Sequence, residues 1–263
     1  MSSLRNLRKK TSLTNHTHPD SYFNVNNKDP EIFAKQISLI GDPLVVENFL
    51  SPSEIQKLIQ IESSKPDSFR QGRPTAAETE VTGHCWEQEE RELLQPKLQK
   101  LLGPFEVWGG NYFSTSLPYA PHVDTGEGIL QANYKNVVIP MSMFPGNKET
   151  HLILFKQRYF GNNTGFYASG ESYPKEFTAN GELFEYSRVL GYDPSHTIKE
   201  SLLSSHLAHL NPKNLQGFSI DRILPWRIGS CIIFDSAQIH CSSDFRRQGI
   251  SRKSALSLFT VRP

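Results

Sequence analysis

The chain has 263 residues, and its 28 Lys and Arg residues almost balance its 27 Asp and Glu residues, leaving a formal net charge of +1. This balance excludes the strongly basic field of a typical nucleic-acid-binding protein and the acidic bias of a solvating tail. Hydrophobic residues make up 37% of the chain, which is enough for one large β domain or two small domains.

Targeting signals and a disulfide framework are also absent from the sequence. No stretch reaches the roughly 18 consecutive apolar residues of a membrane span, and no apolar segment follows the basic first ten residues, as it would in a signal peptide. The three cysteines have no CxxC spacing, which is typical of reduced, buried residues in a reducing compartment. We therefore expect a cytoplasmic protein without nucleic-acid or membrane partners, and the composition gives no indication of its oligomeric state.

The first part of the chain predicts an irregular arm followed by a strand and two helices. Residues 1–38 are polar and lack hydrophobic periodicity, so we expect an arm there and a single domain over 39–263. A short strand is expected at 43–46. Ser51, Pro52 and Glu54 form a capping box with proline at the first helical position, which predicts a helix start. A second helix is expected within 87–102, where Pro96 predicts a kink or a start.

After Gly103 the pattern changes to short runs of β-branched and aromatic residues separated by turns. This texture predicts a mainly β fold with flanking helices (α+β), built as a sandwich or barrel. Strand signals vanish over 157–225, so we interpret this segment as a long lid inserted into the β scaffold, with a helical piece at 198–210. The expected strands lie at 105–108, 136–139, 151–155, 230–234 and 255–261.

The run Tyr119-Ala120-Pro121-His122-Val123-Asp124 is the centre of the functional prediction. Side chains at positions i and i+2 of a strand point to the same face. His122 and Asp124 can therefore reach one point in space, and they would supply two of the three ligands of a facial metal site.

His240 is the candidate for the third ligand, because it follows a buried-looking strand at 230–236. A face of two histidines and one carboxylate suits Fe(II) and leaves coordination positions open for a cosubstrate and O₂. Cysteine would favour zinc instead, but Cys231 and Cys241 do not share the strand parity of His240.

The residues after His240 predict a site for a carboxylate. A turn at 245–249 separates two strand-like runs, and a hairpin symmetric about Arg246 would place Arg252 opposite His240. Arg252 and Ser254 would then share one face and could hold a carboxylate by charge-assisted hydrogen bonds. A carboxylate held near an open Fe(II) site is what 2-oxoglutarate requires.

Together these motifs resemble the Fe(II)/2-oxoglutarate-dependent dioxygenase superfamily, in a prolyl-4-hydroxylase-like form. The resemblance covers residues 42–156 and 226–263. It implies a double-stranded β-helix, or jelly-roll, core. It also implies roles for individual residues: His122, Asp124 and His240 as iron ligands, Arg252 as the 2-oxoglutarate anchor, Ser254 as its helper, and Tyr112 as a further contact.

The sequence departs from the prolyl hydroxylases at two points. Those enzymes usually use lysine as the anchor, so Lys253 competes with Arg252, and one residue of strand register decides between them. His240 comes 118 positions after His122, which is more than the core needs. The lid is therefore large, and the substrate of this chain cannot be inferred from that of the prolyl hydroxylases.

The resemblance implies an oxidoreductase with Fe(II) as cofactor and 2-oxoglutarate and O₂ as cosubstrates, most simply a hydroxylase. The polar lid favours a small polar molecule or an amino-acid-like compound as substrate. Three alternatives stay open: a jelly-roll binding module that keeps a metal only for stability, a peptidyl-prolyl hydroxylase, and a cupin-like metalloenzyme that uses no 2-oxoglutarate.

Overall fold

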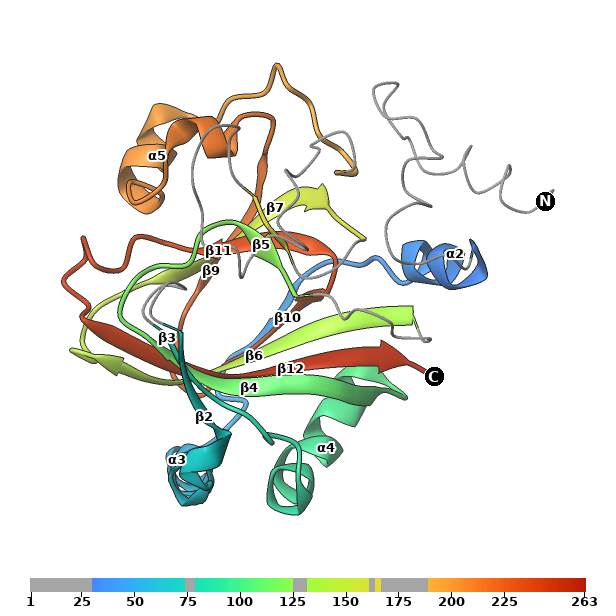
Figure 1. Cartoon of the computed structure of the whole chain (residues 1–263), viewed down its shortest axis with the longest axis vertical. Helices are drawn as coiled ribbons and strands as arrows, with labels where there is room; N and C mark the ends of the chain where they lie inside the picture. The colour runs from blue at the N-terminus through green and yellow to red at the C-terminus, as the bar shows by residue number, and fades with distance from the viewer. Residues whose placement is uncertain (1–29, 74–78, 125–131, 161–163, 167–188) are drawn as a thin grey trace.

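Two antiparallel sheets form the centre of the computed structural model, which describes residues 30–73, 79–124, 132–160, 164–166 and 189–263 (Figure 1). The larger sheet contains β1 (Leu44–Val46), β2 (Arg70–Arg73), β3 (Thr79–Thr82), β4 (Glu106–Thr115), β6 (Ala132–Phe144), β10 (Cys231–Asp235) and β12 (Arg252–Arg262). The smaller sheet contains β5 (His122–Val123), β7 (His151–Arg158), β8 (Thr164–Gly165), β9 (Ile220–Pro225) and β11 (Gln238–Ser242).

The order of the strands in each sheet differs from their order in the sequence. The larger sheet runs β1-β10-β6-β12-β4-β3-β2, and the smaller runs β8-β5-β11-β7-β9. From β4 to β7 and from β9 to β12, consecutive strands alternate between the two sheets. The two sheets share an apolar cluster made of Val138, Leu152, Leu154, Leu224, Trp226, Ile232, Phe234 and Ala255. The predicted mainly β, jelly-roll fold with flanking helices is confirmed.

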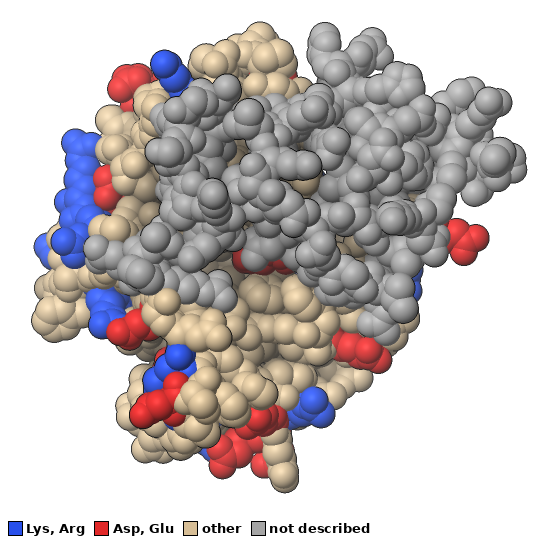
Figure 2. All heavy atoms as spheres, in the orientation of Figure 1, with Lys and Arg blue, Asp and Glu red and all other residues tan. Residues whose placement is uncertain are grey.

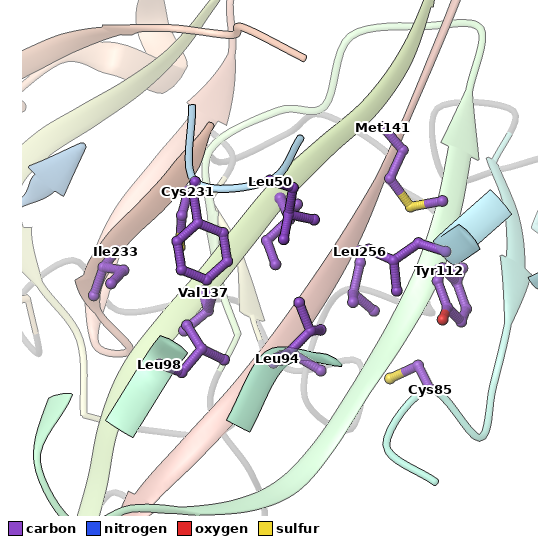
Figure 3. Close-up of a cluster of buried hydrophobic side chains, with 14 of the residues drawn as sticks. Leu50, Cys85, Leu94, Leu98, Tyr112, Val137, Met141, Cys231, Ile233 and Leu256 are labelled. Carbon is purple, nitrogen blue, oxygen red and sulfur yellow. The ribbon is translucent and has the colours of Figure 1, made fainter. Parts of the chain in front are cut away.

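Two helices cover the outer face of the larger sheet, α3 (Pro52–Ser64) and α4 (Gln88–Leu102) (Figure 1). The predicted capping box is present, because the Glu54 amide donates to Ser51 Oγ and the Ser51 amide donates to Glu54. Pro96 lies inside α4, which runs continuously across it. Leucines of α4 pack onto β-strand side chains, with Leu94 and Leu98 fully buried (Figure 3). Burying each such leucine contributes about 1.5–3 kcal/mol.

Residues 189–219 pack on the outer face of the smaller sheet. This region contains α5 (Glu200–His206) and a 3₁₀ turn, η5 (Pro212–Leu215). Leu207, Leu215 and Phe218 are buried there against side chains of β7 and β11. The helical piece expected at 198–210 is therefore present in shortened form.

Two sequence-based expectations need correction here. Strands β8 and β9 lie inside the segment 157–225, where no strand was expected. β9 escaped detection because Asp221 and Arg222 interrupt its apolar residues on a half-exposed strand. Residues 30–38, expected to be irregular, form a helix, α2 (Pro30–Ser38). The remainder of the expected arm, 1–29, and residues 161–163 and 167–188 of the expected lid lie outside the described residues.

Charges of both signs are spread over the described part of the visible surface (Figure 2). This agrees with the balanced composition. Within the described ranges, the helices are too short or too polar to cross a membrane.

A buried ion-pair cluster joins the two sheets. Asp235 of β10 accepts hydrogen bonds from Lys135 of β6 and from Arg158 of β7, whose Nη2 lies 2.9 Å from Asp235 Oδ2. The Gly41 amide also donates to this carboxylate, at 3.2 Å. Asp235 and Lys135 are buried, so both cations depend on one carboxylate for compensation.

We predict that Asp235→Asn lowers the free energy of unfolding by about 3–5 kcal/mol, because it leaves buried charge without a partner. Urea unfolding followed by circular dichroism measures the change. Glu47→Gln is the matched control, because Glu47 pairs with Arg227 at 2.7 Å on the exposed surface; it should cost less than about 1 kcal/mol. Equal effects of the two substitutions would contradict a special role for Asp235.

Candidate metal centre

Three side chains from distant parts of the sequence converge between the sheets. His122 and Asp124 come from β5 and its end, and His240 comes from β11. One nitrogen or oxygen atom of each lies within 4.8 Å of the others. His240 Nε2 is 3.2 Å from Asp124 Oδ2, and His122 Nε2 is 3.9 Å from Asp124 Oδ1. The structure thus brings together the three residues that the sequence proposed as ligands.

Strand pairing explains the convergence. His122 and His240 are direct partners in the antiparallel ladder between β5 and β11, so their side chains lie on the same face. Their ring centroids are 4.2 Å apart. Asp124 is two residues beyond His122 and points to that face as well.

Main-chain acceptors orient both imidazole rings. His122 Nδ1 lies 2.7 Å from the Ala120 carbonyl oxygen, and His240 Nδ1 lies 3.0 Å from the Gln238 carbonyl oxygen. A carbonyl oxygen only accepts, so each Nδ1 carries the proton and donates it. Each Nε2 therefore directs a lone pair toward the common point, which is the tautomer that a metal requires.

Burial keeps His122 in its neutral form. Desolvation, reinforced by the neighbouring His240, lowers the pKa of His122 to about 4. A neutral imidazole is a ligand and an imidazolium is not. Two imidazole nitrogens and one carboxylate on a single face fit a divalent first-row metal such as Fe(II).

A cavity of about 430 Å³ opens beside this cluster. It is lined by residues of both sheets, including Val81, Trp108, Gly109, Gly110, Asn111, Phe113, Tyr119, Val138, Leu152, Trp226, Ser242, Ser257 and Phe259. Its volume falls in the range of small-molecule binding sites.

The predicted hairpin between His240 and Arg252 is wrong. β11 pairs with β5 and β7, whereas β12 pairs with β4 and β6 in the other sheet. The segment after β11 crosses between the sheets instead of turning back on itself. Arg252 consequently lies opposite Phe144.

Arg252 and Ser254 lie on the outer face of the larger sheet. The Arg252 guanidinium is half-exposed and bonds to Glu80 and to Ser114 Oγ. The Ser254 hydroxyl is 2.6 Å from that of Ser142. Leu256, next on this face, packs in the cluster beneath the helices. The structure therefore does not bring Arg252 or Ser254 to the cavity.

Tyr112 also points away from the candidate metal centre. It is buried in the apolar cluster that includes Leu94 and Leu98 of α4 (Figure 3). Its hydroxyl donates to Glu90 Oε1 at 3.0 Å. Burial, with the adjacent Glu90, raises the pKa of Tyr112. Its neighbours Asn111 and Phe113 line the cavity instead.

Lys253, the alternative anchor, points between the sheets. It is 1% exposed, and its Nζ atom lies 3.8 Å from the ring centroid of Trp226, which lines the cavity, and 5.1 Å from that of Phe245. Within the described residues, this nitrogen has no hydrogen-bond partner. Burial lowers the pKa of Lys253 to about 7. An unpartnered buried amine is costly, and a bound anion would relieve the cost.

Several cavity residues carry no sequence signal of their own. Trp108, Asn111 and Phe259 resemble ordinary strand residues, because β4 and β12 lack clear alternation, and Trp226 directly follows β9. The adjacent glycines Gly109 and Gly110 are the single local hint, since glycine within a strand marks a bulge or a close approach.

We predict that His122→Ala and His240→Ala each weaken Mn²⁺ binding by more than the roughly 10–100-fold that follows loss of an outer-shell partner. Each substitution removes a ligand atom rather than a supporting contact. Equilibrium dialysis under anaerobic conditions measures the affinity. The control is His84→Ala, a half-exposed histidine beside Glu87. Unchanged affinity in either ligand variant would contradict the assignment.

No protein-family model matches the chain, and neither does any curated protein. Solved structures do match in fold. The non-heme alpha-ketoglutarate-dependent carbocyclase SnoK from nogalamycin biosynthesis has a TM-score of 0.50 at 16% identity, covering 89% of this chain and 84% of its own. The related epimerase SnoN has a TM-score of 0.48 at 11% identity over the same shares.

A prolyl-4-hydroxylase from Pseudomonas putida has a TM-score of 0.41 at 10% identity, covering 87% of this chain and 96% of its own. At these identities the likeness is one of fold. The chain shares its fold with the alpha-ketoglutarate-dependent carbocyclase SnoK, and it places a histidine–aspartate–histidine cluster inside that fold.

Proposed function

We propose that the chain is an Fe(II)- and 2-oxoglutarate-dependent dioxygenase that hydroxylates a small molecule. One observation carries the proposal: two oriented imidazoles and a carboxylate face a cavity, and a buried amine without a partner among the described residues packs behind Trp226 of its wall. The first group fits the metal, and the second fits the far carboxylate of 2-oxoglutarate.

His122, Asp124 and His240 are the proposed ligands of the metal. His122 and His240 would hold the metal through their Nε2 atoms, and Asp124 would add a carboxylate oxygen on the same face, which would leave coordination positions for a cosubstrate and O₂. When bound there, Fe(II) supplies the oxidising chemistry, in which O₂ gives one oxygen atom to 2-oxoglutarate, yielding succinate and CO₂, and the other to a C–H bond of the substrate. The protein orients the reactants and limits access of water.

Lys253 is the better candidate for the cosubstrate anchor. A protonated Lys253 would bind a carboxylate by a charge-assisted hydrogen bond. Trp226 and Phe245 lie against it and lower the local polarity, which strengthens such a pair. Arg252, by comparison, already pairs with Glu80 on the outer face. The sequence left Arg252 and Lys253 as alternative anchors for 2-oxoglutarate, and these contacts favour Lys253.

The test is an anaerobic titration of the protein with Fe(II) and 2-oxoglutarate. A chelated keto acid gives a weak visible charge-transfer band, and admission of O₂ should then release succinate. We predict that Lys253→Met requires at least about tenfold more 2-oxoglutarate for the band, because a lost charged hydrogen bond costs about 1.5–3 kcal/mol. Arg252→Met is the matched control and should titrate like the wild type.

The alternatives give different results in the same experiment. A binding module with a structural metal would form no band. A cupin-like enzyme would turn over without 2-oxoglutarate. A peptidyl-prolyl hydroxylase would release more succinate when proline-rich peptides are added. If Arg252→Met were impaired and Lys253→Met were not, the anchor assignment would be reversed.

The anchor also predicts a pH dependence. Lys253 is protonated below a pH of about 7 and neutral above it in the free protein. Below this pH, 2-oxoglutarate meets an ammonium that is already charged. Above it, binding must take up a proton, so the affinity should fall by up to about tenfold per pH unit. Titrations of the visible band on both sides of neutrality measure this change.

Lys253→Arg separates this effect from titration of the metal ligands. Arginine stays charged throughout this range, so the added loss of affinity above neutrality should disappear in the variant. The same pH profile in both proteins would place the titrating group elsewhere.

A further inference from the structure

Trp108 is a large side chain left half-exposed in the cavity wall. It is 38% exposed and lines the cavity beside the candidate metal centre. One side of its indole packs on Phe259, with ring centroids 5.4 Å apart and an interplanar angle of 30°. Phe259 therefore fixes the plane of the indole while leaving part of it accessible.

A β-bulge sets the direction of this side chain. Val107 pairs with Thr260 and Gly109 pairs with Phe259, so Trp108 is an extra residue in β4. A bulge redirects the side chain of its strand, and bulges are common next to active sites. The strand therefore departs from regular pairing at the residue that carries the indole.

The cavity wall next to Trp108 is formed by two glycines, Gly109 and Gly110, which have no side chains. A Cβ atom at Gly110 would lie 2.4 Å from the Ser257 carbonyl oxygen, so no larger residue fits there without movement. A Cβ atom at Gly109 would lie 3.5 Å from Phe259 Cδ2. The next side chain along β4 is that of Asn111, which is polar and uncharged.

Apart from the proposed ligand Asp124, the described residues of the lining carry no acidic or basic side chain other than the two histidines of the candidate metal centre. Asn111 and Ser257, which are partners across β4 and β12, are neutral polar residues of the same lining. The ammonium and carboxylate of an amino acid would lose their hydration here without gaining ionic partners.

We propose that the substrate is a neutral molecule with a planar, conjugated ring system that stacks on Trp108. This inference rests on the proposed oxygenase function and narrows its substrate class. An indole face attracts flat rings in offset stacking, and Asn111 and Ser257 can hydrogen-bond a hydroxyl or carbonyl group on the ring. The inference departs from the amino-acid-like substrate that the polar lid suggested.

Three probes of one skeleton test the inference without knowledge of the substrate. 2-Naphthol is planar and neutral, decahydro-2-naphthol is neutral but not planar, and 2-naphthoate is planar but charged. Equilibrium dialysis against the metal-free full chain measures each affinity. We expect 2-naphthol to bind at least about tenfold more tightly than either of the others. Equal affinities, preference for the saturated or charged probe, or no binding of 2-naphthol would overturn the inference.

Variants locate the binding at Trp108. Trp108→Ala should weaken 2-naphthol binding by about tenfold, and Trp108→Phe should stay within about threefold of the wild type, because phenylalanine keeps an aromatic face. Leu101→Ala removes an exposed apolar residue on α4 and serves as the control. An unchanged affinity in Trp108→Ala would contradict the assignment of this residue.

The outcome is separable from that of the proposed function. Probe binding needs neither metal nor cosubstrate, whereas the visible band needs both. A band without selective 2-naphthol binding would refute the substrate class alone. Selective binding without a band would refute the oxygenase proposal and leave an aromatic-binding site.

Discussion

The candidate metal centre depends on two hydrogen bonds from imidazole Nδ1 atoms to main-chain carbonyl oxygens. They fix the tautomer of His122 and His240 and direct both Nε2 lone pairs to one point. The acceptors, Ala120 and Gln238, each lie two residues before the histidine they orient. The strand that supplies each ligand thus also supplies its support, and the geometry does not require a separate shell of polar side chains.

The second constraint is the cost of burying Lys253. An amine enclosed by two aromatic rings has lost its water and, among the described residues, has gained no hydrogen bond. A protein retains such a group where a ligand compensates for it. In this fold the three candidate metal ligands come from the smaller sheet, and the amine comes from the larger sheet, where it packs against Trp226 of the cavity wall.

The sequence was most informative where chemistry and strand parity coincide. His122 and Asp124 lie two residues apart, so their shared face follows from β geometry alone, and His240 could be selected against Cys241 by parity. Strand parity could not decide between Arg252 and Lys253 as the anchor, because the prediction for Arg252 depended on a hairpin that does not form. The crossing of residues 243–251 from one sheet to the other is a property of long-range pairing, which local patterns do not encode.

Similar limits explain the other differences. Tyr112 and its neighbours lie on a strand covered on both faces, so hydrophobicity could not show which of them faces the cavity. The bulge at Trp108 depends on pairing with β12, more than 140 positions further along the chain. The capping box at Ser51 and Glu54, by contrast, is a local device and appeared as expected.

The shortness of β5 gives the candidate metal centre a mechanical consequence. β5 has two residues and pairs with β11 at the single pair His122–His240, so main-chain bonding alone secures the step between β5 and β11 only weakly. A metal ion bound by both of these side chains would cross-link β5 and β11 at this pair. Metal binding and the local unfolding of β5 would then be thermodynamically coupled. Slower hydrogen exchange of the β5 amides would report on both.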